Sequence, residues 1–152
     1  METAKTGGKR DYCSEISVRI PAEEALARIG RVPKWWASDY SGDSEKLGDV
    51  FTIKFGETTV SFRIVEAIPG KKIVWLVTDC HLHWLKDKKE WKSTKIVWEI
   101  AARGDSTSVT FTHLGLVPGI ECFDDCKIGW DFYIKQSLFK YLSEGKGLPD
   151  QG

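Results

Sequence analysis

The sequence has no excess of charge of either sign, because 22 basic residues balance 22 acidic ones over 152 residues. A general nucleic-acid surface needs a basic excess, so we expect no nucleic-acid partner. No run approaches the ~18 consecutive apolar residues of a membrane-spanning helix, and we therefore expect no stable membrane insertion. Residues 1–11 lack the apolar stretch of a secretory signal peptide, so we interpret them as the flexible lead-in of a cytoplasmic protein.

Common catalytic motifs are also absent, namely a nucleophile elbow, a glycine-rich phosphate loop and HExxH. The cysteines are Cys13, Cys80, Cys122 and Cys126. We expect free thiols in a reducing cytosol, and a bridge between Cys122 and Cys126 inside one helix conflicts with disulfide geometry. His81 and His83 form a second pair, but no zinc-type spacing links it to that cysteine pair. We therefore predict no metal, no cofactor and no catalytic residue, and whether the chain is an enzyme stays open.

The chain is instead rich in aromatic residues, with seven Trp, seven Phe and four Tyr. Such large, rigid rings suit either a large core or a lined pocket. The 41% apolar and 29% charged fractions are those of a globular protein, and the length fits one domain. We therefore expect a single domain at residues 12–149, followed by a tail at 150–152.

Alternation of apolar residues with period two predicts a series of short strands. The first runs from Tyr12 to Ile20, and later ones lie near residues 51–55, 60–64, 73–77, 94–100 and 109–113. Residues 38–48 are turn-like, with room for one weak strand. Close spacing and short turns, such as Pro69-Gly70, indicate an antiparallel meander.

Helix signals lie on both sides of these strands. Pro21, with acidic residues after it and Gly30 at the end, predicts a short helix, and Pro33 opens a second short element. From Pro118-Gly119 to Gly145 the pattern predicts a helix of roughly 25 residues, near 40 Å long. A sheet with one apolar face must cover it. The predicted class is α+β: a curved antiparallel sheet of about six or seven strands on a long C-terminal helix, with two short helices after the first strand.

Several stretches carry a family resemblance: Gly48–Phe51, Glu90–Ile96, Thr112–Pro118, and the Cys122, Cys126, Gly129-Trp130 pattern with Ser137-Leu138 after it. Over residues 12–149 the chain is similar to the START-like superfamily (SRPBCC, Bet v 1-like), in the branch named after the activator of the ninety-kilodalton heat-shock protein's ATPase. The resemblance implies a helix-grip fold with a cavity between sheet and helix. Members bind lipids, hormones or polyketides, some are cyclases or hydroxylase subunits, and the branch name implies a co-chaperone role in the stress response.

A candidate pocket follows from the predicted inner faces. At 100° per residue, the helix places Cys122, Cys126, Gly129, Trp130, Tyr133, Ser137 and Tyr141 on one stripe. Its small residues permit either close packing or a groove that a ligand fills. The predicted ligand-binding residues are Trp35, Trp36, Phe51, Phe55, Phe62, Trp75, Trp98, Phe111, His113, Cys122, Cys126, Trp130 and Tyr133. The polar groups that could orient a ligand are His113, Tyr133, Tyr141 and Arg63.

Two further features leave alternatives open. Ile128, Phe132 and Phe139 form a second apolar row on the helix, which either packs within the chain or meets another subunit in a homodimer. The irregular segment from His81 to Lys92 is either an exposed hairpin or a gate over the cavity, with Trp35 and Trp36 at the opposite entrance. The leading hypothesis is binding of a lipid, polyketide or aromatic metabolite. The alternatives are a co-chaperone-like interaction module and a cyclase- or hydrolase-like enzyme.

Overall fold

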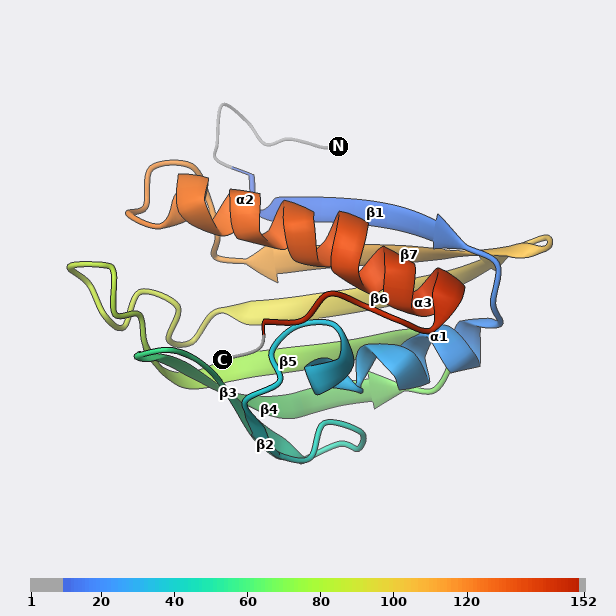
Figure 1. The fold of residues 1–152 in the computed structure, drawn as a ribbon, viewed down its shortest axis with the longest axis horizontal. Helices are drawn as coiled ribbons and strands as arrows, with labels where there is room; N and C mark the ends of the chain where they lie inside the picture. Colours follow the sequence, from blue (N-terminus) through green and yellow to red (C-terminus); the bar gives the residue numbers. More distant parts are fainter. Residues whose placement is uncertain (1–9, 151–152) are drawn as a thin grey trace.

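The computed structural model describes residues 10–150. The expected lead-in and tail therefore lie almost wholly outside the described residues. Within them, one sheet holds seven strands in the order β1-β7-β6-β5-β4-β3-β2, and every neighbouring pair is antiparallel. The strands are β1 Tyr12–Val18, β2 Tyr40–Gly42, β3 Val50–Phe55, β4 Thr58–Ile68, β5 Lys72–His81, β6 Lys95–Arg103 and β7 Ser106–Leu114. The predicted curved antiparallel sheet is confirmed (Figure 1).

Strand register places one large side chain beside another on the inner face of the sheet. Trp75 is paired with Ile96, Trp98 with Phe111, and Ile96 also with His113. Because side chains alternate between faces, each pair brings two buried residues to the same side. The period-two pattern of the sequence thus becomes one continuous apolar surface.

Two short helices follow β1, as predicted: α1 at Ala22–Ile29 and a 3₁₀ turn, η1, at Val32–Lys34. Acidic residues occupy the first turn of α1 and Arg28 its last turn, which complements the helix dipole. Gly30 ends the helix where the chain passes close to Ser44. A Cβ at this position would lie 2.8 Å from the Ser44 carbonyl oxygen, so only glycine fits.

The C-terminal helix covers the inner face of the sheet, and α1 lies beside its far end (Figure 1). It consists of α2 Phe123–Phe132, a π-helical segment η2 Tyr133–Leu138, and α3 Phe139–Glu144. The expected start at Pro118-Gly119 is wrong, because Gly119 has φ +106°, a left-handed conformation that no right-handed helix contains. Gly145 ends the helix in the left-handed conformation, as its position predicts.

The π-helical segment changes which helix residues are buried. A uniform 100° step predicts a stripe through Tyr133 and Ser137. The structure also buries Ile134, Leu138 and Leu142 completely. A π turn holds more residues than the 3.6 of an α turn. Residues spaced by four, such as Ile134, Leu138 and Leu142, therefore stay on the face toward the sheet, whereas in a uniform α-helix each would be rotated further from it.

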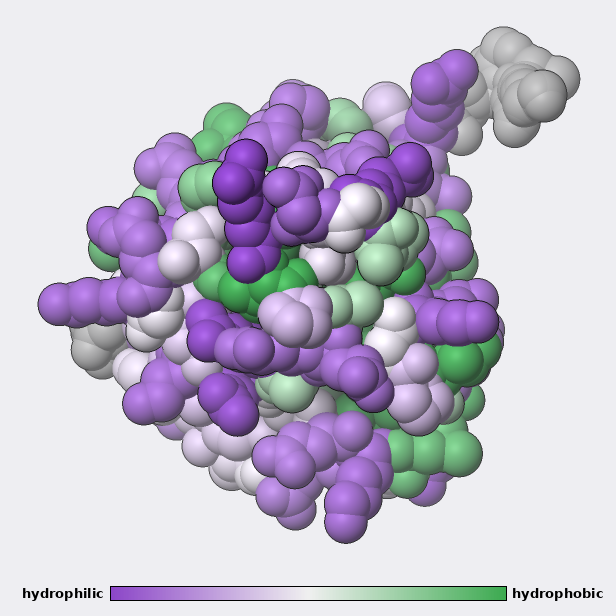
Figure 2. Space-filling view, turned by 90° about the vertical axis from the view of Figure 1, so that its right-hand side faces the viewer, coloured by the Kyte–Doolittle hydropathy of each residue, from purple (hydrophilic) through white to green (hydrophobic). Residues whose placement is uncertain are grey.

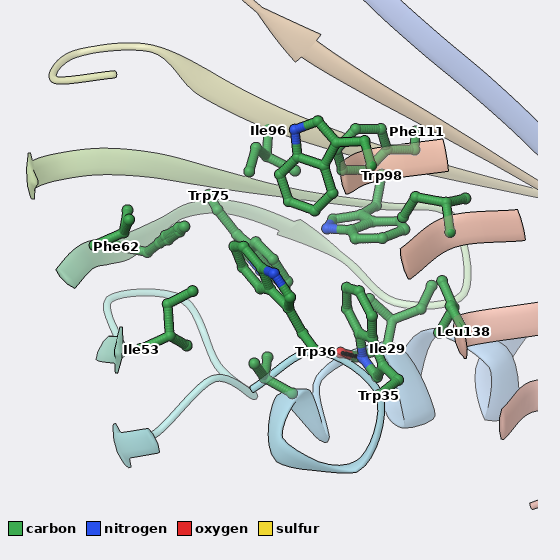
Figure 3. Close-up of a cluster of buried hydrophobic side chains, with 14 of the residues drawn as sticks. Ile29, Trp35, Trp36, Ile53, Phe62, Trp75, Ile96, Trp98, Phe111 and Leu138 are labelled. Atoms are coloured by element: carbon green, nitrogen blue, oxygen red, sulfur yellow. Dashed lines mark hydrogen bonds between the residues drawn. The ribbon is translucent and has the colours of Figure 1, made fainter. Parts of the chain in front are cut away.

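Tryptophan rings fill the centre of the sheet–helix interface (Figure 3). Trp98 lies 5.7 Å from Trp35, 5.5 Å from Trp75 and 4.9 Å from Phe111, measured between ring centroids. These four residues are fully buried. The indole N–H groups of Trp75 and Trp98 have no hydrogen-bond partner among the described residues. The centre is therefore a buried aromatic core, and none of these four residues lines the pocket described below.

Within residues 10–150, no helix has both the length and the apolar character needed to cross a membrane. The end of the molecule at the right of Figure 1 is mainly hydrophilic, with small, separated hydrophobic areas (Figure 2).

Candidate functional site

A pocket of about 250 Å³ lies at the opposite end, where the segment after β5 meets α2 (left in Figure 1). It is formed by four parts of the chain: the loop after η1, strands β3 and β4, the segment 82–94, and the first half of the C-terminal helix. The lining residues are Trp36, Phe55, Thr58, Val60, Leu82, Trp84, Trp91, Asp125, Cys126, Gly129, Trp130 and Tyr133.

Five predicted ligand-binding residues line this pocket, namely Trp36, Phe55, Cys126, Trp130 and Tyr133. The other eight do not: Trp35, Phe51, Phe62, Trp75, Trp98, Phe111, His113 and Cys122 are packed in the core. Trp35 and Trp36 were expected at an entrance opposite the 81–92 segment. Instead, Trp36 lines the same pocket as that segment, and Trp35 is buried.

Aromatic rings form an unbroken wall around the pocket. Trp91 stacks on Trp130 at 5.9 Å, and Trp130 lies 4.8 Å from Trp36. Trp36 lies 5.9 Å from Phe55, which is 6.3 Å from Tyr133. Neighbouring rings support one another in fixed orientations at these separations. The wall is therefore rigid and almost entirely apolar.

Gly129 and Ser137 differ in how closely the chain packs around them on the helix stripe. A Cβ built on Gly129 meets no atom within 4 Å, so close packing does not require glycine there. Ser137, by contrast, serves packing: its hydroxyl donates to the Trp35 carbonyl and accepts from the Leu148 amide. The groove is open at Gly129 and closed at Ser137.

Sequence reasoning missed Thr58, Val60, Leu82, Trp84, Trp91 and Asp125 as lining residues. Trp84 and Trp91 flank the charged residues 86–90 in the sequence, as the apolar anchors of a solvated loop do, and this signal could have placed both at the pocket. Thr58 and Val60 gave no signal beyond strand alternation. Asp125 lies in the first turn of the helix, where acidic residues usually stay solvated, and it is exposed at the rim of the pocket.

Two carboxylates join the 82–94 segment to the helix start, and we call Glu90 and Glu121 the carboxylate latch. Glu90 accepts hydrogen bonds from the backbone amides of Glu121 and Cys122, both at 2.9 Å. Glu121 accepts from the amides of Lys86 and Asp87, at 2.8 and 3.1 Å. These amides stabilise the charged form and lower the pKa of Glu121. The latch holds the loop that carries Trp84 and Trp91 over the pocket.

His113 is fully buried behind the pocket wall and does not line the pocket. Its Nδ1 accepts a hydrogen bond from Trp130 Nε1 at 3.1 Å, so Nε2 carries the proton and donates to Thr94 Oγ1 at 2.9 Å. The Thr94 hydroxyl in turn donates to the Trp91 carbonyl. Burial lowers the pKa of His113 to about 3. A neutral histidine bonded at both nitrogens orients Trp130 and Trp91 and has no free atom for a ligand.

Cys122 and Cys126 form a disulfide in the structure, with Cα atoms 5.6 Å apart. The expectation of free thiols is wrong for this pair. The helix proper starts only at Phe123, so Cys122 lies outside it, and the two side chains can meet across the first turn. The Trp91 indole N–H donates to Cys122 Sγ at 3.2 Å, which ties the pocket wall to this bridge. Cys13 and Cys80 are free.

The remaining predicted residues lie away from the pocket. Arg63, expected on the inner face, is exposed on the outer face of β4. Tyr141 is buried, and the Arg28 guanidinium lies over its ring, with Cζ 6.0 Å from the ring centroid. Ile128 is 69% exposed on the helix, whereas Phe132 and Phe139 are 36% and 40% exposed. The Phe132 ring also lies edge-on to Tyr133 at 5.1 Å, so this row is partly packed within the described chain and partly open. No cluster of three or more potential metal ligands occurs among residues 10–150.

No protein-family model matches the chain, and no curated protein matches it. Solved structures do. The solution structure of the Aha1 dimer from Colwellia psychrerythraea has a TM-score of 0.74 at 22% identity, over 90% of this chain and 98% of that chain. CalU16 from Micromonospora echinospora has a TM-score of 0.65 at 16% identity, over 93% of this chain and 83% of that one.

DynU16, a protein in the dynemicin biosynthetic locus, has a TM-score of 0.66 at 17% identity, over 89% of this chain but only 48% of that one. At such identities the likeness concerns the fold. It confirms the helix-grip fold, which this chain shares with these solved structures.

Proposed function

We propose that this chain binds a small apolar or amphipathic molecule in the pocket between β3, β4, the 82–94 segment and α2. At about 250 Å³ the pocket is just below the roughly 300–1,000 Å³ of sites that enclose whole drug-sized ligands. It fits one aromatic metabolite, or one end of a lipid or polyketide whose remainder stays outside. Proteins of this fold from biosynthetic loci, such as DynU16, are in keeping with such a ligand. A cytoplasmic location remains part of this proposal.

One observation carries the proposal: a rigid aromatic wall faces open space at Gly129. Tightly packed helices place glycine where a neighbour would collide with a Cβ, and here none would. Burial of a ligand against these rings contributes about 25 cal/mol per Å² of apolar surface before the costs of association. A carboxylate or histidine poised for catalysis would favour an enzyme, but the one acidic lining residue, Asp125, is exposed.

The test combines ligand discovery with a variant that fills the space. Native mass spectrometry of the protein as expressed, followed by lipid extraction and a thermal-shift panel of metabolites, should reveal a ligand. Gly129→Leu should abolish its binding without lowering thermal stability, because the leucine enters the pocket and favours the helix. Gly129→Ala is the matched control and should still bind. No bound molecule and no thermal shift across the panel would defeat the proposal.

A second candidate function, homodimerisation, is favoured by the exposed row of Ile128, Phe132 and Phe139. A solved structure of the same fold is described as a dimer. Ile128→Lys combined with Phe132→Lys should then convert a dimer to a monomer in multi-angle light scattering. A wild-type chain that is monomeric at high micromolar concentration would rule this function out.

A further inference from the structure

The charges of the pocket lining have a single sign. Asp125 is the one ionisable lining residue that carries charge at neutral pH, and no Lys, Arg or His lines the pocket. Asp125 is exposed at the rim, where its carboxylate faces solvent. An anionic ligand would find no partner for its charge here, and burying an unpaired charge is costly.

Two tryptophans of the wall, Trp91 and Trp130, have their indole N–H groups bonded within the protein. Trp91 Nε1 donates to Cys122 Sγ, and Trp130 Nε1 donates to His113 Nδ1. The hydroxyl of Thr58, another lining residue, accepts from the His83 amide at 3.1 Å. Because these N–H groups are bonded within the protein, the two indoles present only ring carbon atoms to a ligand. The faces of these rings carry partial negative charge from their π-electrons.

The surroundings reinforce this polarity. Burial, and then the charge of Asp150, raise the pKa of Tyr133, so this lining phenol is uncharged. The ammonium group of Lys88, from the same loop as Trp84, donates to the carbonyls of His83 and Leu85. That cation is held within the loop and does not line the pocket.

We propose that the pocket selects an organic cation, such as a quaternary ammonium group, over neutral and anionic groups of the same shape. This inference rests on the proposed ligand-binding function and adds the charge of the ligand. Aromatic faces attract cations within about 6 Å of the ring centroid, and the attraction grows when the site excludes water. Trp36, Trp91 and Trp130 supply such faces, the half-exposed Trp84 adds a fourth, and Asp125 supplies the counter-charge.

Three probes of one shape separate charge from apolar fit: benzyltrimethylammonium, its neutral isostere neopentylbenzene, and the anion benzylsulfonate. Binding is measured by tryptophan fluorescence and by NMR shifts of the indole N–H signals. We expect the cation to bind at least tenfold more tightly than the neutral probe, because cation–π attraction adds to apolar contact. The sulfonate should bind weakest.

Two pairs of variants locate the effect. Asp125→Asn should weaken the cation several-fold and leave the neutral probe unchanged, and salt should reduce the difference because the carboxylate is exposed. Asp124→Asn, one residue away and not lining the pocket, is its control. Trp84→Leu should weaken the cation more than the neutral probe, whereas Trp84→Phe, which keeps a π face, should retain most of the preference.

The possible results are distinguishable. If the neutral probe binds as tightly as the cation, the charge preference is wrong, while the proposed ligand-binding function stands. A second result would overturn both this inference and the function it rests on. In that case neither the cation nor the neutral probe binds at millimolar concentration, and Gly129→Leu and the wild type give the same result in the ligand panel.

Discussion

The centre and the open end of the sheet–helix interface are built from the same kinds of residue, but the centre is filled and the end holds a pocket. At the centre, Trp35 enters from the loop after η1 and meets Trp98 and Trp75 of the sheet. At the end, the corresponding space lies beneath Gly129, which has no side chain to fill it. Trp36 joins the two regions, because it contacts both Trp75 and Trp130.

The difference teaches that composition does not decide between core and cavity. Both regions have aromatic walls and small helix residues. The centre closes because the segment after η1 is pinned against the helix: Ser137 binds Trp35, and Asp150 pairs with Trp36 and Ser38 through backbone hydrogen bonds. The end stays open because the carboxylate latch holds the 82–94 segment at the helix start, where it borders the pocket without filling it.

The largest expected effect separates a core tryptophan from a pocket tryptophan. Trp98→Ala should lower the free energy of unfolding by about 3–5 kcal/mol, because a fully buried ring leaves a cavity that the core cannot close. Trp84→Ala should change it by only about 0.5 kcal/mol, because that ring is 48% exposed. Urea unfolding of both variants checks the contrast, and similar losses in the two would contradict the assignment of core and pocket.

A smaller effect depends on His113, which supports the pocket wall from the core side. Its folded pKa of about 3 lies below the ordinary 6.5, so the unfolded chain takes up the proton first as pH falls. The contribution of the neutral His113 to the free energy of unfolding is therefore fully present above pH 6.5 and is lost as the pH falls toward 3. Between pH 7 and pH 5 the free energy of unfolding should fall by roughly 2 kcal/mol.

Urea unfolding at both pH values tests this dependence. His113→Gln should be less stable than the wild type at pH 7, and the gap should narrow at pH 5. A constant gap would show that His113 does not carry the pH dependence.

Breaking the carboxylate latch should lower the free energy of unfolding by less than the changes above, but it should alter ligand access to the pocket. Glu90→Ala leaves the amides of Glu121 and Cys122 without their acceptor, at a cost of about 1 kcal/mol, as for the loss of a helix cap. Hydrogen exchange in residues 82–94 and ligand on-rates should both rise. Lys92→Ala, an exposed change in the same segment, is the control and should alter neither. Unchanged on-rates in Glu90→Ala would reject the gate interpretation.

The smallest change concerns the bridge between the buried Cys122 and the pocket-lining Cys126. Since this pair is joined and the other two cysteines are free, the unreduced, denatured protein should show two reactive thiols rather than four. Reduction should expose the other pair and shift the indole N–H signal of Trp91, whose partner is Cys122 Sγ. Four reactive thiols before reduction would contradict the disulfide.

Much of the fold could be predicted from local patterns. Alternation located every long strand, because in an antiparallel sheet with one buried face every second residue of a strand is apolar. The helix start was placed too early, because Pro118 and Gly119 resemble a helix start although the φ of Gly119 excludes it. Ile134 and Leu138 were missed as core residues, because the π turn that buries them has no signature in apolar spacing.

The site was predicted less well for a different reason. Phe62, Trp75 and Phe111 were assigned to a pocket because they face inward, and facing inward is common to core and pocket residues. Trp84 was left out because a charged, irregular segment does not reveal which surface it returns to. Its position depends on contacts such as the hydrogen bond from the Glu121 amide to the Glu90 carboxylate, two residues that lie 31 apart in the sequence.

The sequence by itself determined the order of strands and helices and the need to cover one apolar face, because period and capping act among neighbours in the chain. From these the helix-grip fold follows. Only the tertiary structure decided where the interface closes and where it stays open. That outcome depends on Trp36, the 82–94 segment and Gly129 meeting from distant parts of the chain, and on whether the side chains that meet there fill the space between them.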